Sequence, residues 1–404
     1  MNNVEYFKNA GYGMMMHFGL YSVLGGEYKG KFGDNYAEWI GSHFAIPIKE
    51  YEKLAAAFNP IYFNADESGK CVMTSFDTEK GFQSTVDCTT ERPGRYVINA
   101  SKLSKIVKLM PDSDVTINIS ENKLATITGG RAKFELHALS GDDFPSIPML
   151  SGETGFKIEA SVLKKLISQV FFAVAVNDQR PMLCGAYFEI LEGKLRVVSC
   201  DGNRLALREK DCSIENISTT ENEETVSFIV PGKALSQIMK LINDKEDIVT
   251  IYLTRKHVIF KFENKVFFSR LIDSKYIDYE RVIPKTAKTV VRGSRTAIIS
   301  ALERASLVTE DRALGQAKSC VKCEFTGDVI RVSSSSVTGS VYDEVAIDME
   351  GDDLLIGFNC RYLIDAFRSA DSDNVKITLN NPLMSIIIEP DGENEEGEKY
   401  LYMV

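Results

Sequence analysis

The sequence predicts an α+β protein of tandem domains, in which amphipathic helices pack on one face of antiparallel sheets. Three observations predict this class. The chain has 404 residues, 44% of them apolar, which is enough for roughly three domains with their own cores. A pattern of strand, helix, acidic turn and further strands recurs at a spacing of roughly 130 residues, as in tandem domains. The predicted strands alternate apolar and polar residues, which is typical of strands buried on one side.

The copies of the recurring unit are most similar at a strand followed by a helix. A short strand precedes an amphipathic helix in "RYVINASKLSKIVKLM", "SFIVPGKALSQIMKLI" and "LLIGFNCRYLIDAFRS". A second, related pattern occurs only in the middle and last parts of the chain, so those domains hold two half-units and the first holds one. We therefore expect an incomplete first domain at 69–150 and complete domains at 151–284 and 285–404. Residues 1–68 share nothing with the repeat and contain the only tryptophan, Trp39.

The composition excludes several classes of protein. No apolar run approaches the ~20 residues that cross a bilayer, and the N-terminus lacks a signal segment, so we expect a cytoplasmic protein without membrane contact. The cysteines are scattered singly, as reduced thiols are, and Cys320 and Cys323 have no second pair or nearby histidine to complete a metal site. No phosphate loop of the GxxxxGK[ST] type occurs. We predict no metal and no cofactor.

The placement of positive residues says more than the net charge of −10, which argues against a simple basic nucleic-acid binder. Each predicted helix carries basic residues on the side opposite its apolar stripe. On one helix this pattern is typical of a solvated surface, but its recurrence predicts a positive track for a polyanion, and the lack of interleaved aromatics favours a duplex. The basic helix residues are Lys102, Lys105, Lys108, Lys164, Lys165, Lys233, Lys240, Arg295, Arg304, Arg361 and Arg368.

From about residue 71 to the C-terminus the chain resembles the bacterial DNA polymerase III beta sliding clamp family. The segments that carry the resemblance are "GDDFPSIPML", "SCDGNRLALRE", "VPGKALSQIMKLI", "SRLIDSKYIDYERVIPK" and "IGFNCRYLIDAF". The resemblance implies tandem DNA-clamp domains in a head-to-tail homodimeric ring, with antiparallel sheets outside and helices lining a central channel around duplex DNA. It implies a processivity factor of DNA replication, not an enzyme, and therefore no catalytic residues.

The resemblance also implies partners and the site that receives them. The partners are double-stranded DNA, the DNA polymerase III catalytic subunit, the clamp loader complex, and other DNA polymerases and repair proteins with clamp-binding peptides. In the family such a peptide carries a glutamine and apolar anchors and enters a cleft between the middle and last domains. The residues that match this cleft are Leu183, Cys200, Gly202, Asn203, Arg204, Leu205, Ile277, Arg281, Val282, Met403 and Val404.

Two further surfaces follow from the resemblance. The loop 177–182 resembles the family's DNA-touching loop, which adds Asn177 and Arg180 to the predicted DNA contacts. The family's acidic patch across the dimer joint is represented here only by Asp343 and Glu344. The joint itself would place one set of residues of this chain, Lys102, Arg131, Lys133 and Leu136, against Leu307 and Val308 of the second copy.

The N-terminal segment resembles a different family. Residues 5–67 resemble the start of glycoside hydrolase family 29 α-L-fucosidases, in "GYGMMMHFGLYS" and "EYEKLAAAFNP". The resemblance implies a βα fragment of TIM-barrel type, in which His17 matches a sugar-binding histidine. A retaining glycosidase needs two carboxylates about 5 Å apart, supplied by later barrel strands that this chain lacks. We therefore expect a fragment without the enzyme, standing in place of the opening half-unit of the first clamp domain.

Two alternatives stay open at this point. One is a remnant of an α-L-fucosidase. The other is a clamp-like adaptor that binds partner peptides but never closes on DNA. The missing half-unit and the reduced acidic patch favour the adaptor, because both would weaken ring closure. The ending "YLYMV" stops a few residues earlier than the family pattern, so we expect one wall of the peptide cleft to be incomplete.

Overall fold

The structure is a computed structural model that describes most of residues 60–404 and two short strands before them. Those strands, β1 (Glu27–Tyr28) and β2 (Lys31–Phe32), pair with each other. His17 and Trp39, and with them most of the fucosidase-like segment, lie outside the described residues. After residue 60, the stretches outside the description are 112–113, 149–150, 153, 192, 218–225, 243–247, 310–319, 337–338 and 393–396.

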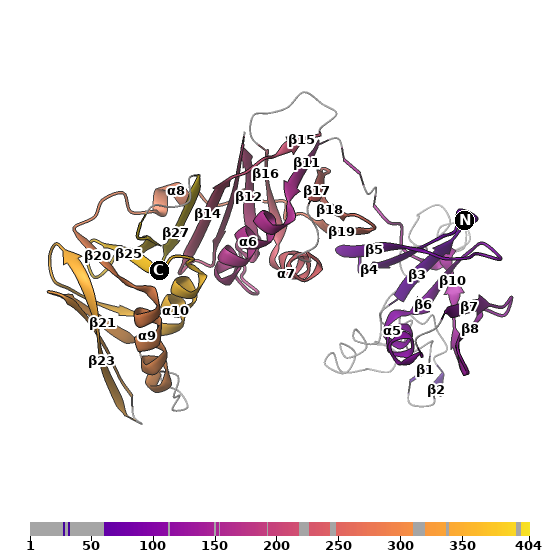
Figure 1. The fold of residues 1–404 in the computed structure, drawn as a ribbon, viewed down its shortest axis with the longest axis horizontal. Coiled ribbons are helices and arrows are strands. Elements are labelled where there is room, and N and C mark those ends of the chain that lie inside the picture. The colour runs from indigo at the N-terminus through magenta and orange to yellow at the C-terminus, as the bar shows by residue number, and fades with distance from the viewer. Residues whose placement is uncertain are drawn as a thin grey trace, which may run out of the picture. The chain divides into compact units, whose positions relative to one another are not determined.

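The chain divides into two compact units, residues 1–150 with 261–268, and residues 151–260 with 269–404 (Figure 1). In the first unit, five neighbouring strands of a larger sheet have the order β10-β6-β3-β4-β5, and a separate sheet has the order β7-β8-β9. Its elements are β3 (Pro60–Ala65), β4 (Lys70–Phe76), β5 (Lys80–Asp87), β6 (Gly94–Asn99), α5 (Ala100–Leu109), β7 (Val115–Ile119), β8 (Leu124–Gly129), β9 (Ala132–His137), β10 (Leu139–Ser140) and a 3₁₀ turn (Gly141–Asp143).

Strand β3 changes the interpretation of the N-terminal segment. The sequence assigned residues 60–65 to a barrel-type fragment, but Tyr62 is opposite Thr74 of β4 and Val97 of β6 in antiparallel pairs. Phe63 is buried in the core of this unit, together with Ile98 and Leu103. Residues 60–65 are therefore a central strand of the first clamp-like sheet, and the structure shows no barrel-type βα fragment among its described residues.

Helix α5 follows the predicted pattern. The Asn99 side chain accepts a hydrogen bond from the Lys102 amide at 2.9 Å, which caps the first turn. Leu103 is buried against the sheet, while Lys105 and Lys108 are exposed. The helix ends at Leu109, two residues before Pro111. Its basic side therefore faces solvent, as the sequence predicted.

The second unit contains the last domain and most of the middle domain, whose residues 261–268 are grouped with the first unit. The elements of the middle domain are β11 (Thr154–Glu159), α6 (Ala160–Val170), 3₁₀ turns at Phe171–Ala173 and Pro181–Cys184, β12 (Gly185–Leu191), β13 (Lys194–Cys200), β14 (Leu205–Asp211), β15 (Glu215–Asn216), β16 (Val226–Pro231), α7 (Gly232–Leu241), β17 (Ile248–Leu253), β18 (His257–Phe262) and β19 (Lys265–Arg270). A linker that contains the short helix α8 (Tyr279–Val282) leads to the last domain.

The elements of the last domain are β20 (Thr289–Ser294), α9 (Arg295–Thr309), β21 (Val321–Thr326), β22 (Val329–Ser335), β23 (Ser340–Glu350), β24 (Leu354–Phe358), α10 (Cys360–Ser369), β25 (Asn374–Leu379), β26 (Ile387–Pro390) and β27 (Glu398–Met403). Strand β27 pairs with β14 of the middle domain, with Met403 opposite Leu205. One sheet of 12 strands, β16-β12-β13-β14-β27-β26-β25-β20-β23-β22-β21-β24, therefore runs through both domains.

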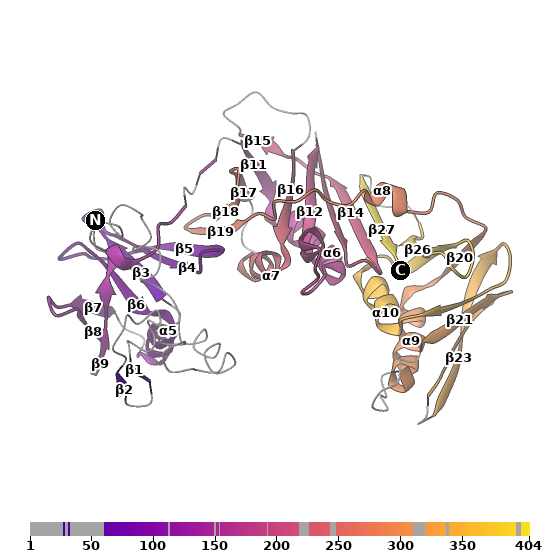
Figure 2. The ribbon, with the colours of Figure 1, turned by 180° about the vertical axis from the view of Figure 1, so that it is seen from behind.

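The helices of the second unit form one layer. Helix α6 contacts α7 and α10, and α10 contacts α9, so the four helices form the row α7-α6-α10-α9. Figures 1 and 2 show this row along one side of the strands. The predicted α+β class is confirmed, because each domain packs its helices against antiparallel strands. Within the described residues, no helix is long and apolar enough to cross a bilayer.

Candidate partner-binding cleft and basic helix faces

The turn between β13 and β14 begins the candidate cleft. Cys200 and Leu205 face each other at the ends of the two strands. In the turn, Asp201 Oδ1 accepts hydrogen bonds from the amides of Asn203 (2.9 Å) and Arg204 (3.0 Å). Gly202 has φ +90°, a conformation that side-chain-bearing residues rarely adopt. The sequence "CDGNRL" therefore folds into a tight turn that fixes its two flanking apolar residues.

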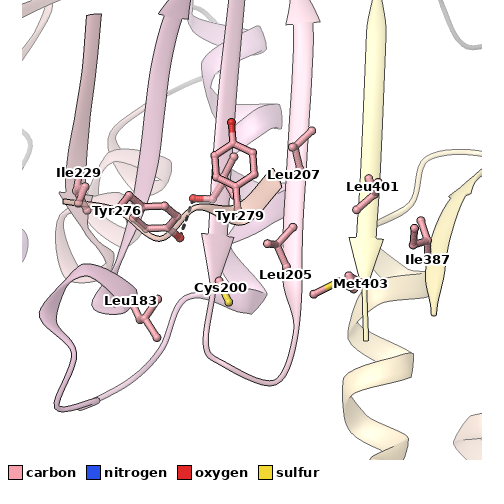
Figure 3. Packing of buried hydrophobic residues seen from close by; sticks show 11 residues of the cluster. Leu183, Cys200, Leu205, Leu207, Ile229, Tyr276, Tyr279, Ile387, Leu401 and Met403 are labelled. Carbon is pink, nitrogen blue, oxygen red and sulfur yellow. Dashed lines mark hydrogen bonds between the residues drawn. The ribbon is translucent and has the colours of Figure 1, made fainter. Parts of the chain in front are cut away.

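An apolar cluster joins the two domains next to this turn (Figure 3). The middle domain contributes Leu183, Cys200 and Leu205, and the last domain contributes Met403 and Ile387. The pairs Leu205–Met403 and Met403–Ile387 lie opposite each other on neighbouring strands, so the strand register brings both domains to one apolar site. Burial raises the pKa of the Cys200 thiol, which leaves this cysteine a neutral part of the apolar floor.

The linker forms the rim of this cluster. Tyr276 and Tyr279 are buried in it and Ile277 is partly buried against it. The Arg281 side chain is 86% exposed and pairs with Asp278 at 2.9 Å. Val282 is 50% exposed at this rim. At the other rim, Val404 exchanges backbone hydrogen bonds with Ile386, so the last predicted cleft residue is also held in place.

The Arg204 side chain is bound within the protein and is not freely accessible in the predicted cleft. Its three guanidinium nitrogens donate to Asp201 (2.9 Å), to Asp365 of α10 (2.8 Å) and to the Phe172 carbonyl (2.6 Å). The guanidinium also lies 4.4 Å from the ring centroid of Tyr362. The side chain is 11% exposed, so in this structure Arg204 holds the two domains together.

Several residues of the cluster were missed by the sequence reasoning. Five of them lie on strands and two lie on the linker, and only the fold brings them together. The aromatic spacing in "SKYIDYERV" is the one signal that could have found two of them. The missed members are Val198, Leu207, Ile229, Tyr276, Tyr279, Ile387 and Leu401. Leu383 (97% exposed) and Met384 (41% exposed) lie in the loop just before β26 and add exposed apolar surface close along the chain to Ile387.

The loop that contains Asn177 and Arg180 lies beside the turn of the cleft. Asn177 is exposed and has φ +57°, a turn conformation that asparagine tolerates. Arg180 pairs with Asp178 at 3.0 Å, and hydrogen bonds from Arg180 lower the pKa of Asp178 to about 2. The Arg180 guanidinium also reaches Gly202, where an added Cβ would lie 2.6 Å from it. Arg180 thus borders the cleft and keeps half of its side chain exposed.

The predicted DNA-contact residues separate into two groups. One group is exposed and makes no ion pair among the described residues: Lys102, Lys105, Lys108, Lys233, Lys240 and Arg361. The side chains of the other group bind partners within the chain. Two donate hydrogen bonds to carbonyl oxygens: Lys164 to Ile242 (3.1 Å) and Arg295 to Ser372 (2.7 Å). Three form ion pairs: Lys165 with Asp371 (3.0 Å), Arg304 with Asp343 (2.6 Å) and Arg368 with Glu303 (2.6 Å).

Ion pairs connect the middle and last domains at their boundary. Arg208 of β14 is fully buried, lies 3.3 Å from Glu398 and 3.7 Å from Asp371, and stacks at 4.7 Å on the ring of Tyr400. Lys210 also pairs with Glu398. In these ion pairs the cation belongs to the middle domain and the carboxylate to the last. Charge complementarity therefore adds to the β14–β27 pairing in joining the two domains.

Most of the residues predicted at the dimer joint are at least partly exposed in the single chain. Arg131, just before β9, and Lys133 of β9 are exposed, and Lys133 pairs with Glu135 at 2.8 Å. Leu136 is half-buried. Leu307 is 74% exposed at the end of α9, and Val308 is half-buried. The two predicted acids already have partners, since Asp343 pairs with Arg304 and Glu344 with Arg331 (3.4 Å).

No metal centre is found where the structure describes the chain, because no three His, Cys, Asp or Glu side chains come together there. Cys320 is exposed and Cys323 is buried, so these two thiols do not share a face. What remains is a scaffold of repeated α+β domains, with basic residues on its helices and an apolar cluster where the middle and last domains meet. These features define a clamp-type scaffold.

Comparisons with known proteins identify the family. Three models of the DNA polymerase III beta subunit match: the N-terminal domain at residues 51–148, the central domain at 157–278 and the C-terminal domain at 280–404. The beta sliding clamp of Staphylococcus aureus is 30% identical over 335 residues, which are 80% of this chain and 85% of the relative. That of Bacillus subtilis is 29% identical over 351 residues, 86% of this chain and 90% of the relative.

Solved structures agree with the sequence relatives. The DNA polymerase sliding clamp of Bacillus subtilis superposes with a TM-score of 0.77 at 28% identity, covering 85% of this chain and 90% of that one. The DNA polymerase III beta subunit of Thermotoga maritima gives 0.75 at 27% identity, with the same coverage. The chain belongs to the DNA polymerase III beta subunit family and is a DNA sliding clamp, a non-catalytic processivity factor of replication. The match from residue 51 agrees with β3 as part of the first domain.

Proposed function

We propose that two copies of this chain join head to tail into a ring that encircles duplex DNA, with the helix layer toward the DNA and the sheets outside. The observation that carries the proposal is the row α7-α6-α10-α9 on one side of a continuous sheet, with Lys233, Lys240 and Arg361 exposed and unpaired among the described residues. Weak, non-directional attraction to phosphates allows sliding, while topological linkage prevents escape. The net charge of −10 disfavours DNA binding elsewhere on the surface.

The joint of the proposed ring uses the two exposed surfaces predicted for it. Arg131, Lys133 and Leu136 of one copy, with Lys102, would meet Leu307 and Val308 of the other. The exposure of Leu307 supports this, since a large apolar side chain at a helix end is stabilised by burial against a partner. The boundaries near residues 150 and 284 are proposed as the limits of the three clamp domains.

The cleft is proposed as the site for peptides of the partner proteins. The DNA polymerase III catalytic subunit, the clamp loader complex, and other DNA polymerases and repair proteins would each insert apolar anchors over Leu183, Leu205 and Met403. The exposed Val282 and Leu383 support such a site, because they flank a buried apolar cluster with apolar surface that lacks cover. A polymerase held there gains effective concentration at the primer end. Such a ring would act on DNA in the cytoplasm.

Plasmid retention tests the ring. Protein loaded on nicked circular DNA by a clamp loader should stay bound through gel filtration in 0.5 M NaCl and be lost after linearisation with a restriction enzyme, since sliding off an end requires an end. Equal loss from circular and linear DNA would contradict encirclement. Loss from both, together with retained peptide binding, would favour the adaptor that does not close on DNA.

The fucosidase remnant stays a separate prediction for the N-terminal segment. It is tested by release of an aryl group from an aryl α-L-fucoside. Turnover that disappears in the His17→Ala variant would favour it, and absence of turnover in the unmodified chain would dismiss it.

A further inference from the structure

A polar network lies outside the residues assigned to the cleft. The Tyr279 hydroxyl donates to Glu189 Oε2 at 2.6 Å and accepts from Arg196 Nη1 at 3.0 Å. Arg196 also reaches Glu189 at 3.3 Å. Tyr279 belongs to the linker, whereas Glu189 and Arg196 lie opposite each other on β12 and β13. The network therefore ties the linker to the sheet of the middle domain.

The network is partly shielded from solvent, and each of its three side chains has a hydrogen-bond partner. Arg196 is 22% and Glu189 17% exposed, and Arg196 makes a further charge-assisted bond to Glu209 at 2.6 Å. Burial, and then the bond to Glu189, raise the pKa of Tyr279, so its hydroxyl stays a donor. Hydrogen bonds from Arg196 to Tyr279 and Glu209 raise the pKa of Arg196 despite its burial. Each member thus keeps the protonation state that the network needs.

The same tyrosine is part of the cleft. Its ring is buried in the apolar cluster with Leu183 and Leu205, near Tyr187, which stacks on Tyr276 at 4.9 Å between ring centroids. Figure 3 shows Tyr276 and Tyr279 on the segment that crosses the strands beside the cluster. Tyr279 is the first residue of α8, and Val282, exposed at the rim, is its last.

Helix α8 cannot hold this position by itself. It has only four residues and no side-chain cap at Asp278. A helix this short is not stable by itself, because the conformational entropy lost in forming the first turn outweighs the stabilisation by its few hydrogen bonds. Its placement depends on side chains that anchor it to the sheet. The Tyr279 hydroxyl supplies a buried polar anchor, and the exposed Glu280 of α8 adds an ion pair with Arg196 at 3.6 Å.

We propose that Glu189, Arg196 and Tyr279 are positioning residues that set the linker wall of the peptide cleft. The inference rests on the proposed peptide-binding function and adds to it a polar network that supports the wall through the Tyr279 hydroxyl. Loss of the Tyr279 hydroxyl leaves the apolar cluster intact but frees the polar end of the ring, so α8 and Val282 lose their fixed distance from Leu183. Peptide affinity then falls because the wall must be ordered on binding.

The test is a double-mutant cycle read by peptide affinity. The probe is a fluorescein-labelled synthetic peptide that carries one glutamine, one leucine and one phenylalanine, titrated by fluorescence anisotropy. Tyr279→Phe should weaken binding about fivefold, and this loss should shrink below about twofold in a Val282→Ala background, because the two positions act through one wall. Tyr342→Phe, which removes a hydroxyl bonded to Glu344 on β23, should change nothing.

Each other outcome has a definite meaning. An unchanged affinity of Tyr279→Phe, or the same fold loss in both backgrounds, overturns the positioning role. If Tyr279→Phe does not fold, Glu189→Gln takes its place, since it places an amide against Arg196 and should weaken binding in the same coupled way. If the unmodified protein does not bind the probe, the proposed cleft function fails before the positioning role is reached.

Discussion

Two groups of helices carry the same sequence pattern and use it differently. On α5 and α7 the lysines are exposed and make no ion pair among the described residues. On α6 the equivalent lysines are bound within the chain, Lys164 to the Ile242 carbonyl and Lys165 to Asp371 and Glu398. The difference follows from position. Lys164 binds inside the middle domain, to the residue that follows α7, whereas Lys165 reaches across to the last domain. A basic helix face is therefore either open to a polyanion or bound within the chain. We call the charged contact between the two domains, formed by Lys165, Arg208 and Lys210 with Asp371 and Glu398, the fastening group.

The largest expected effect breaks the fastening group. Arg208→Ala should lower the free energy of unfolding of the second unit by about 3 kcal/mol or more, because it removes a fully buried cation from Glu398 and from the ring of Tyr400. Urea unfolding followed by tyrosine fluorescence measures this loss. The volume-preserving Arg208→Met should cost less. Equal stability of Arg208→Ala and the unmodified protein would show that the buried cluster does not hold the domains.

The next effect removes the open group on α5. A triple Lys102→Ala, Lys105→Ala, Lys108→Ala variant should bind duplex DNA with a salt dependence about three units shallower in log K against log [NaCl], since each phosphate contact contributes about −0.9. Its unfolding free energy should stay unchanged. An unaltered slope would show that α5 does not face DNA, whereas a large loss of stability would show that its lysines are structural.

Acid should weaken the fastening group but leave the open group unaffected. Burial alone would raise the pKa of Glu398. The hydrogen bond from Lys210 and the positive charges of Lys165 and Arg208 outweigh this effect and lower the pKa below 4.5. A carboxylate with a lowered pKa in the folded state stabilises fully above its unfolded pKa, and this contribution is lost as pH falls below that value. Unfolding of the second unit should become easier below pH 4.5, and Glu398→Gln should flatten this dependence. An identical pH profile in both proteins would contradict the assignment.

The smallest effect concerns the outer edge of the fastening group. Lys165→Ala should cost at most about 1 kcal/mol, because its pair with Asp371 is partly solvated, with side chains 39% and 44% exposed. Differential scanning fluorimetry against Asp371→Asn measures it. A loss as large as that of Arg208→Ala would mean that solvent screening at this edge has been overestimated.

Much of the fold could be predicted from the repeat, and the reason is local. Helices α5, α7 and α10 begin within the aligned segments, and their buried residues fall on the predicted apolar stripes. The cleft was predicted only in part. Leu183, Cys200 and Leu205 lie in recognisable segments, whereas Ile387 and Leu401 join them through strand pairs that no local pattern specifies.

The features that the sequence could not resolve share one physical cause, which is dependence on distant partners. Arg204 resembles a free cleft residue until the fold brings Asp365, 161 residues away, to its guanidinium. Likewise, residues 60–65 alternate like any half-buried strand, and only their pairing with β4 and β6 decides which sheet they join. Charge pairs and strand partners are properties of the assembled domains, so the helix pattern alone could not separate the open lysines from the fastening ones.

The most direct test compares α7 with α6 in one titration. The pair Lys233→Ala, Lys240→Ala removes two open lysines, and the pair Lys164→Ala, Lys165→Ala removes two bound ones, with the same change in net charge. The salt slope of duplex DNA binding should become shallower by about two units for the first pair and stay that of the unmodified protein for the second. Equal slopes for both pairs, or a change only in the α6 pair, would contradict the division of the helix layer into an open and a fastening part.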